Sequence, residues 1–168
     1  MKFSKVCAKI GQEKMHEQVR VAVKESGTLD EVRDNILDLL KHMVDAEGVT
    51  QIGYVAAIIT SDGPEKIPQN LERLQRYTEH VRKTQSYPVF SATDVFTDEL
   101  FERLFAAGFK NEDWTVFWRE VLGEAYVTDM FMTPRWEESK GASDEYQIAK
   151  RTGKTLHYFN YQIDSIER

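Results

Sequence analysis

Cysteine is almost absent from this chain, since Cys7 is the only one in 168 residues. A single thiol excludes a disulfide within the chain and a zinc site built on cysteines, and it fits a reducing compartment. Long apolar runs are also missing, because charge returns at Lys9 and no stretch is apolar enough to cross a bilayer. We therefore expect a cytoplasmic protein that makes no contact with membranes.

An excess of basic residues is missing as well, because the formal net charge is −6. Proteins that bind the phosphate backbone of a nucleic-acid polymer generally carry a basic face, so we expect no such partner. The chain has neither a Walker loop nor a Gly-x-Gly-x-x-Gly element, and its four histidines are scattered. We therefore assign no metal and no cofactor.

The residues that are present are typical of a folded protein, with 41% hydrophobic and 30% charged side chains. Apolar runs bounded by turn residues predict strands at 52–60, 87–92, 127–133 and 155–159. Apolar residues at helical spacing predict helices at 5–24, 29–46, 70–82, 97–105, 114–122 and 145–151. Thr28 and Glu31 form a capping-box pattern before the second helix, and Thr97 is a plausible cap for the fourth.

Strands that alternate with helices predict a parallel sheet with right-handed crossovers. The expected fold is a flavodoxin/Rossmann-like three-layer α/β sandwich with a mainly parallel sheet. Residues 49–168 would form this α/β domain, and residues 1–48 an N-terminal helical extension.

The stretch 136–149, Trp-Glu-Glu-Ser-Lys-Gly-Ala-Ser-Asp-Glu-Tyr-Gln-Ile-Ala, is the most informative part of the chain. It predicts a strand end, a turn at Gly141 and a helix that carries Asp144 and Glu145 in its first turn. Such loops lie at the carboxyl end of a parallel sheet, where these folds bind ligands. Acidic residues in a first helical turn are also explained by the helix dipole alone, so spacing leaves both interpretations open.

A family resemblance rests on this stretch and on residues 54–70. Asp129 in the strand is followed by Ser139, Gly141 and then Glu145, six residues after the serine. The pattern resembles the nucleoside 2-deoxyribosyltransferase superfamily, especially its small uncharacterised members and its nucleotide N-glycosidase branch. The resemblance covers residues 53–159, and it departs from the family at Ala57, where glycine is expected.

The resemblance implies catalytic roles for three acidic residues. Glu145 would be the nucleophile that attacks the anomeric carbon of an N-glycoside, and Asp129 is the strand acid of the motif. The family acid that protonates the leaving base has no direct match, because Val121 stands at the expected offset and Glu120 is its neighbour. Glu120 is equally well explained as a solvated carboxylate paired with Arg119 or a lysine.

The resemblance also implies a ligand site around Ser139, which binds the 5′-phosphate in the nucleotide-hydrolysing branch. Lys140 would add charge to this site, and Gly141 belongs to the same motif. Thr60 and Ser61 would donate to a phosphate from the loop after the first strand. The alternative interpretations are a solvated lysine and turn-forming hydroxyls.

Three more residues are candidates for substrate binding. Tyr54 and Asn70 recur in the small members of the family, and Trp136 would stack on a base. The alternatives are core packing for Tyr54 and a helix cap for Asn70.

Two functions from different classes follow. The first is cleavage or transfer of the N-glycosidic bond of a nucleoside or nucleotide, in a protein that forms a homo-oligomer as members of the superfamily do. The alternative is a non-catalytic nucleotide-binding or interaction module on the same fold, since fold alone does not decide function. A third interpretation is a structural subunit whose N-terminal helices mediate assembly.

Overall fold

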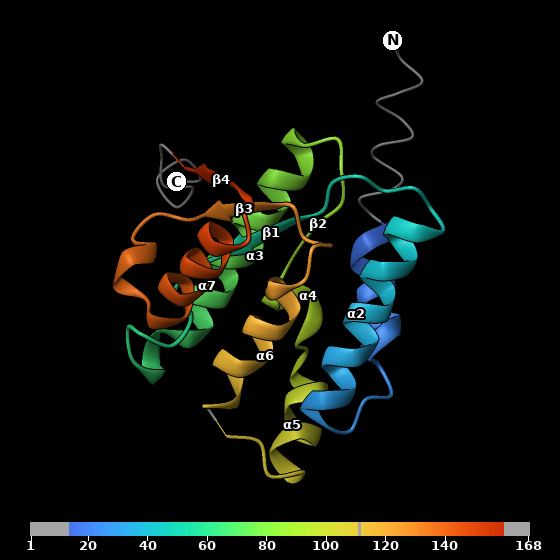
Figure 1. Ribbon diagram of the computed structural model, residues 1–168. Coiled ribbons are helices and arrows are strands. Elements are labelled where there is room, and N and C mark those ends of the chain that lie inside the picture. Colours follow the sequence, from blue (N-terminus) through green and yellow to red (C-terminus); the bar gives the residue numbers. More distant parts are fainter. Residues whose placement is uncertain (1–13, 111, 160–168) are drawn as a thin grey trace.

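The computed structural model describes residues 14–110 and 112–159, and its centre is a four-stranded parallel sheet (Figure 1). The strand order is β2-β1-β3-β4, and all three neighbouring pairs are parallel. The strands are β1 (Gly53–Ala56), β2 (Val89–Ser91), β3 (Asp129–Met132) and β4 (Thr155–Tyr158). The predicted parallel α/β architecture is therefore confirmed.

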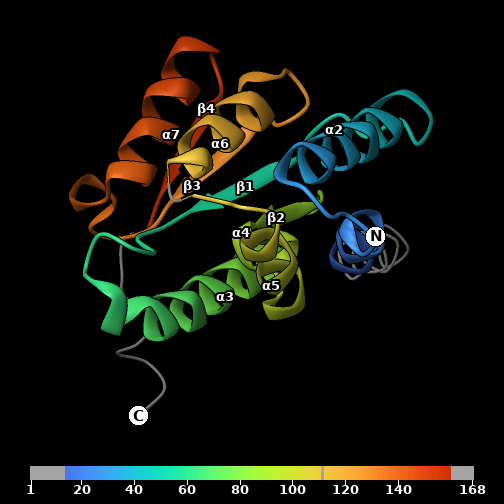
Figure 2. The same ribbon diagram turned by 90° about the horizontal axis from the view of Figure 1, so that it is seen from below.

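Helices cover both faces of the sheet and give the molecule three layers (Figure 2). One face carries α3 (Ile67–Thr84), α4 (Ala92–Val95) and α5 (Asp98–Ala106). The other face carries α6 (Asp113–Gly123) and α7 (Lys140–Arg151), and α2 (Leu29–Asp45) packs against α6. The first three strands are buried along their whole length, as expected for a parallel sheet between two helical layers, whereas β4 is partly exposed at one edge.

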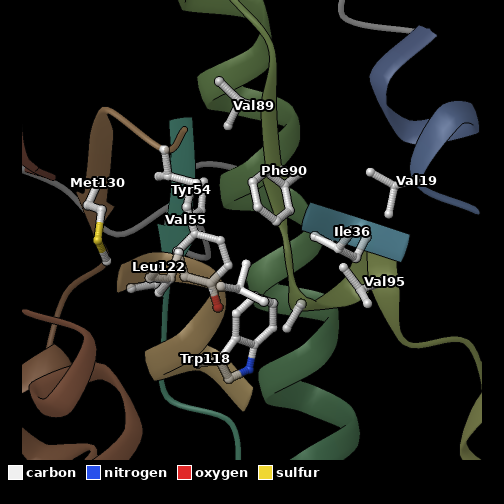
Figure 3. Close-up of a cluster of buried hydrophobic side chains, with 14 of the residues drawn as sticks. Val19, Ile36, Tyr54, Val55, Val89, Phe90, Val95, Trp118, Leu122 and Met130 are labelled. Atoms are coloured by element: carbon white, nitrogen blue, oxygen red, sulfur yellow. The ribbon is translucent and has the colours of Figure 1, made fainter. Parts of the chain in front are cut away.

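Capping and apolar spacing explain α2, which matches its prediction closely. The Thr28 side chain accepts a hydrogen bond from the Glu31 amide. Four residues at helical spacing are fully or almost fully buried: Val32, Ile36, Leu40 and Met43. A helical segment at 14–23 adds further buried residues, and both segments share one hydrophobic core with the sheet (Figure 3). Cys7 and the first part of the predicted helix 5–24 lie outside the described residues.

Several boundaries differ from their predictions, and two of them concern the ends of the first two strands. The first strand ends at Ala56 instead of residue 60, and the Ala56 carbonyl there accepts hydrogen bonds from both the amide and the hydroxyl of Thr133. The second strand gives way to α4, a short helix that the sequence did not predict, because Ser91 and Asp94 form a capping box. None of the described helices is long and apolar enough to cross a membrane.

Candidate functional site at the carboxyl end of the sheet

The helix that carries Glu145 begins earlier than predicted. Ser139 is its N-cap and accepts a hydrogen bond from the Ala142 amide at 3.2 Å, so α7 starts at Lys140. Gly141 is helical, and its φ does not fall in the left-handed region. The predicted turn at Gly141 is therefore wrong, and Glu145 lies in the second helical turn rather than the first.

The side chain of Glu145 meets Tyr54 beneath α7. The Tyr54 hydroxyl donates a hydrogen bond to Glu145 Oε1 at 3.2 Å. Both side chains are buried, with Glu145 at 7% exposure and Tyr54 at 2%. The structure thus brings together two candidate residues that are 91 positions apart in the chain, one from the central strand and one from the last helix.

Burial controls the charge of this pair. Loss of solvation raises the pKa of Glu145 from 4.5 to about 8, although the Tyr54 hydrogen bond acts in the opposite direction. Burial and the neighbouring Glu145 raise the pKa of Tyr54 well above its usual value. Glu145 is therefore mostly a neutral acid at pH 7, and only its ionised fraction can act as a nucleophile.

Two loops join at the carboxyl ends of β1 and β3, on either side of the point where the strand order reverses. The Lys140 amide donates a hydrogen bond to Ser61 Oγ at 3.2 Å. Arg135 lies 3.5 Å from Asp62 and also pairs with Glu138. Arg135 has a φ of 65°, the single positive φ among the described non-glycine residues. In open α/β sheets this reversal point is where ligands bind.

Asn70 and Thr60 shape the first of these loops. Asn70 Nδ2 donates to the Ile59 carbonyl at 3.1 Å and to Asp62 Oδ2 at 3.4 Å. Asn70 is buried inside the first turn of α3 and is not its cap, because the helix begins at Ile67. The Thr60 carbonyl accepts from the Gly63 amide, so Thr60 begins a tight turn and its side chain is exposed.

Trp136 lies beside α7. Its ring packs on Tyr146, with centroids 4.3 Å apart and planes inclined by 30°. Tyr146 also carries Lys150 Nζ 5.6 Å above its ring. Since Tyr146 follows Glu145 directly, this aromatic pair lies about 100° around the helix from the glutamate.

Asp129 and Glu145 lie on opposite faces of the sheet. Gly53 pairs with Asp129 and Tyr54 with Met130, and successive side chains of a strand alternate between faces. Asp129 bonds His157 Nε2 at 2.8 Å and accepts from Thr128 Oγ1 at 2.6 Å. The structure therefore does not bring these two acids together.

Tyr87 lies near Asp129 and forms a hydrogen bond with it. Burial and then the nearby Asp129 carboxylate raise the pKa of Tyr87 to about 12. Asp129 stands at the first residue of β3, which is the amino end of the strand. The ligand-binding edge of a parallel sheet is the other one.

Glu120 does not approach Glu145 either. Its carboxylate bonds Arg33 Nη1 of α2 at 2.8 Å, and Glu120 is exposed. The predicted alternative partner, Arg119, instead forms two hydrogen bonds with Asp144, at 2.8 and 2.9 Å. These two ion pairs tie α6 to its neighbouring helices on either side.

A hollow of about 350 Å³ lies elsewhere, between α2, α5 and α6. Arg33, Glu120, Phe109 and Phe117 are among the residues that line it, and Glu145 is not. Within residues 14–110 and 112–159, no group of three or more His, Cys, Asp or Glu side chains is placed to hold a metal ion. The candidate site at the carboxyl end of the sheet is thus identified by the Tyr54–Glu145 hydrogen bond and the raised pKa of Glu145.

Trp118 is a core residue, as its helical spacing indicates, and it is 6% exposed. Its ring packs on Tyr54 with centroids 4.8 Å apart, and Figure 3 shows it beside the tyrosine hydroxyl. Arg135 was not singled out from the sequence, because a non-glycine residue with positive φ leaves no signal there.

Comparison of the chain with protein-family models, with curated proteins and with solved structures gives no match. The resemblance to the nucleoside 2-deoxyribosyltransferase superfamily thus stays a prediction from the quoted motif.

Proposed function

We propose that this protein cleaves or transfers the N-glycosidic bond of a nucleoside or nucleotide, with Glu145 as the nucleophile. The observation that carries the proposal is the Glu145–Tyr54 hydrogen bond. A buried carboxylate with a raised pKa and a fixed hydrogen-bond donor is a frequent property of catalytic acids and nucleophiles. Its helix begins beside the loop that follows β1, so a ligand at this edge would lie near the glutamate.

The chemistry requires the ionised form of Glu145. A carboxylate oxygen would bond the anomeric carbon while the bond to the base nitrogen breaks, and the departing base would take a proton from water. Water or a second base would then break the resulting ester and regenerate the carboxylate. Tyr54 would hold the carboxylate in position through its hydroxyl, which also favours the charged form.

A 5′-phosphate would bind at the amino end of α7. The Ser139 side chain and the amides of Lys140 and Gly141 lie there, where the helix dipole favours an anion. Ser61 is bonded to the Lys140 amide, so a phosphate would replace this contact. We therefore expect the protein to bind a nucleoside 5′-monophosphate more tightly than the unphosphorylated nucleoside.

A binding module without catalysis is the second candidate, and one observation favours it. Neither Asp129 nor Glu120 reaches Glu145, so neither of the two predicted acids is in place to protonate a leaving base. Glu145 itself is mostly neutral at pH 7. Such a module would bind a nucleotide and release it unchanged.

The test measures base release from nucleosides and their 5′-monophosphates by chromatography at pH 8, where Glu145 is substantially ionised. Glu145→Gln is expected to lower base release at least 100-fold, because an amide cannot form the ester. The matched control is Glu72→Gln, since Glu72 is an exposed carboxylate on α3 paired with Arg76. Retained turnover in folded Glu145→Gln contradicts the nucleophile, and saturable binding without any release supports the module.

Homo-oligomer formation remains part of the proposal. Among the described residues, four large apolar side chains are exposed: Val21, Phe105, Val116 and Tyr158. Light scattering at several protein concentrations measures the association directly, and a monomeric mass throughout contradicts it.

A further inference from the structure

The hollow between α2, α5 and α6 lies apart from the proposed site, because none of Tyr54, Ser139 and Glu145 lines it. Its volume of about 350 Å³ falls within the range of sites that bind ligands. Figure 1 shows α5 beside the beginnings of α2 and α6 at the lower end of the molecule. The lining residues come from these helices, from the Thr28 cap and from the connection after α5, and none belongs to a described strand.

Buried and exposed apolar side chains meet at this hollow. Leu104 and Phe117 line it and are 1% and 2% exposed, whereas Val116 also lines it and is 52% exposed. Phe105 is 59% exposed, and its ring centroid lies 5.5 Å from that of Phe109, another lining residue. Two of the four exposed large apolar side chains of the described residues thus gather at the hollow and its margin, as at surfaces that bind proteins.

Carboxylates outnumber cations around the hollow. Arg33 Nη1 bonds Asp30 at 3.0 Å and Glu120 at 2.8 Å, and all three residues line the hollow. Arg33 Nε bonds Asp34 at 2.9 Å. Three carboxylates around one guanidinium leave this cluster with a net negative charge, and Asp113 adds a further carboxylate to the lining.

Helix dipoles account for only part of this charge. Asp30 and Asp113 stand in the first turns of α2 and α6, where the dipole favours acidic residues. Glu120 stands near the end of α6, where the dipole disfavours them. Its neighbour Arg119 does not compensate, because it is bound to Asp144.

An amphipathic helix with basic residues fits this combination of surfaces. Addition of a strand needs an exposed sheet edge, and no described strand lines the hollow. A helix that binds in a groove instead uses its apolar face, which would cover Phe109 and Val116. Lysine or arginine residues beside that face would lie against the carboxylates of Asp113 and Glu120.

We propose that the hollow between α2, α5 and α6 is the docking site for a basic amphipathic helix of a partner protein. The apolar side chains supply affinity, and the carboxylates select a basic partner over an acidic one. The proposal does not depend on N-glycosidic chemistry, since Glu145 does not line the hollow.

Fluorescence anisotropy with labelled synthetic peptides tests this docking site on the full chain. The probe is a helix-forming peptide of about 14 residues, in which leucines form one face and lysines the other. One control peptide has the same composition in shuffled order and lacks the apolar face, and a second carries glutamate in place of lysine. We expect saturable binding of the probe, binding of the shuffled peptide weaker by roughly 10-fold or more, and no binding of the glutamate peptide. No saturable binding of the probe, or equal binding of the shuffled peptide, overturns the proposal.

Val116→Lys locates the binding on the molecule. It removes an apolar contact and places a positive charge at the hollow, so we expect the probe to bind more weakly by roughly 10-fold or more. Val21→Lys is the matched control, because Val21 is 74% exposed, undergoes the same change of charge and does not line the hollow. Its affinity should stay within about twofold of that of the unaltered protein. Equal affinities for the two variants overturn the assignment of the hollow.

Glu120→Gln tests the part played by charge. One carboxylate fewer would face the lysines, so we expect the probe affinity to fall roughly 3- to 5-fold and its dependence on salt to decrease. Glu72→Gln on α3 is the control, since Glu72 does not line the hollow. An unchanged affinity and salt dependence for Glu120→Gln overturn the choice of a basic partner.

A second copy of the chain is the alternative occupant of the hollow, and light scattering distinguishes it from a partner protein. We expect Val116→Lys and Val21→Lys to have the same oligomeric state as the unaltered protein. Self-association that Val116→Lys abolishes and Val21→Lys leaves intact would place another copy in the hollow and overturn the proposal.

Discussion

Protonation of Glu145 is the property of a single residue on which the proposed chemistry depends. Its pKa rises from 4.5 to about 8 because the folded protein withholds water from the carboxylate. The sequence predicted Glu145 and Tyr54 separately, since each stands in a recognisable motif. Their hydrogen bond joins residues far apart in the chain, so only the folded structure reveals it.

Replacing Glu145 with glutamine should change how stability depends on pH. The folded state binds this proton more tightly than the unfolded state, so the contribution is complete below pH 4.5 and is lost as the pH rises through about 8. Between pH 5 and pH 9 we expect the unaltered protein to lose more unfolding free energy than Glu145→Gln, by on the order of a few kcal/mol. Urea denaturation across this pH range measures the difference.

Parallel curves for the two proteins would mean that the carboxyl group ionises freely in the folded state. Glu72→Gln again serves as the control, because its exposed side chain should leave the pH dependence unaltered.

Among the secondary-structure elements, α7 shows most clearly where sequence patterns fail. Gly141 suggested a turn, yet the Ser139 cap starts the helix before it. Glycine is unfavourable inside a helix but is tolerated when a cap and a buried face stabilise it, and Ala142, Ile148 and Ala149 form that face. The long central helices were predicted well because their apolar spacing extends over several turns.

Gly141→Ala distinguishes a structural from a functional glycine. A Cβ at Gly141 would meet only Ser139 Oγ, at 3.9 Å, so the structure has room for it. We expect alanine to stabilise the protein by roughly 0.5–1 kcal/mol, as alanine does inside helices. Thermal or urea unfolding measures this gain. A loss of stability would contradict the helical position of Gly141.

Nucleotide affinity of the same variant carries separate information. If stability rises while affinity falls, the glycine serves close approach of a ligand to the backbone.

For the whole molecule, the parallel sheet between helical layers follows from the alternation of apolar strands and amphipathic helices. The polar contacts of Asp94, which connect the N-terminal helical segment to the layer of α3 and α4, could not be predicted in the same way. Asp94 accepts hydrogen bonds from Arg82 Nη2 at 2.6 Å and from the Ser91 amide at 2.8 Å, and it also contacts His16. Polar contacts over 78 residues leave no periodic signal in the sequence.

Asp94→Asn should weaken these contacts and lower the free energy of unfolding. Burial acts to raise the pKa of Asp94, but His16, Arg82 and the Ser91 amide together bring it below its usual value. Its contribution is therefore present at neutral pH and is lost as the pH falls through the lowered pKa. We expect a loss of about 3 kcal/mol at pH 7, because a buried ion pair loses one partner.

Urea denaturation measures this loss, and Asp38→Asn is the control, since Asp38 is exposed on α2. A change below about 0.5 kcal/mol for Asp94→Asn, as for a surface residue, would contradict the prediction that the Asp94 contacts stabilise the fold.

The shared core also bears on any truncation of the chain. Residues 14–45 contribute buried side chains to the same core as the sheet, including Ile36 and Leu40. Removing residues 1–47 would expose this core and destabilise the fold. A change in the oligomeric state of the truncated protein could therefore result from unfolding.

Asp129 and Glu145 belong to one stretch of 17 residues, yet the sheet lies between their side chains. The two positions share no hydrogen-bond partner among the described residues, since Asp129 is bonded to Thr128, His157 and Tyr87 and Glu145 is bonded to Tyr54. Substitutions without shared partners act additively on stability. The two halves of the motif are therefore independent: substitutions around Asp129 on one face of the sheet should leave the surroundings of Glu145 on the other face unchanged.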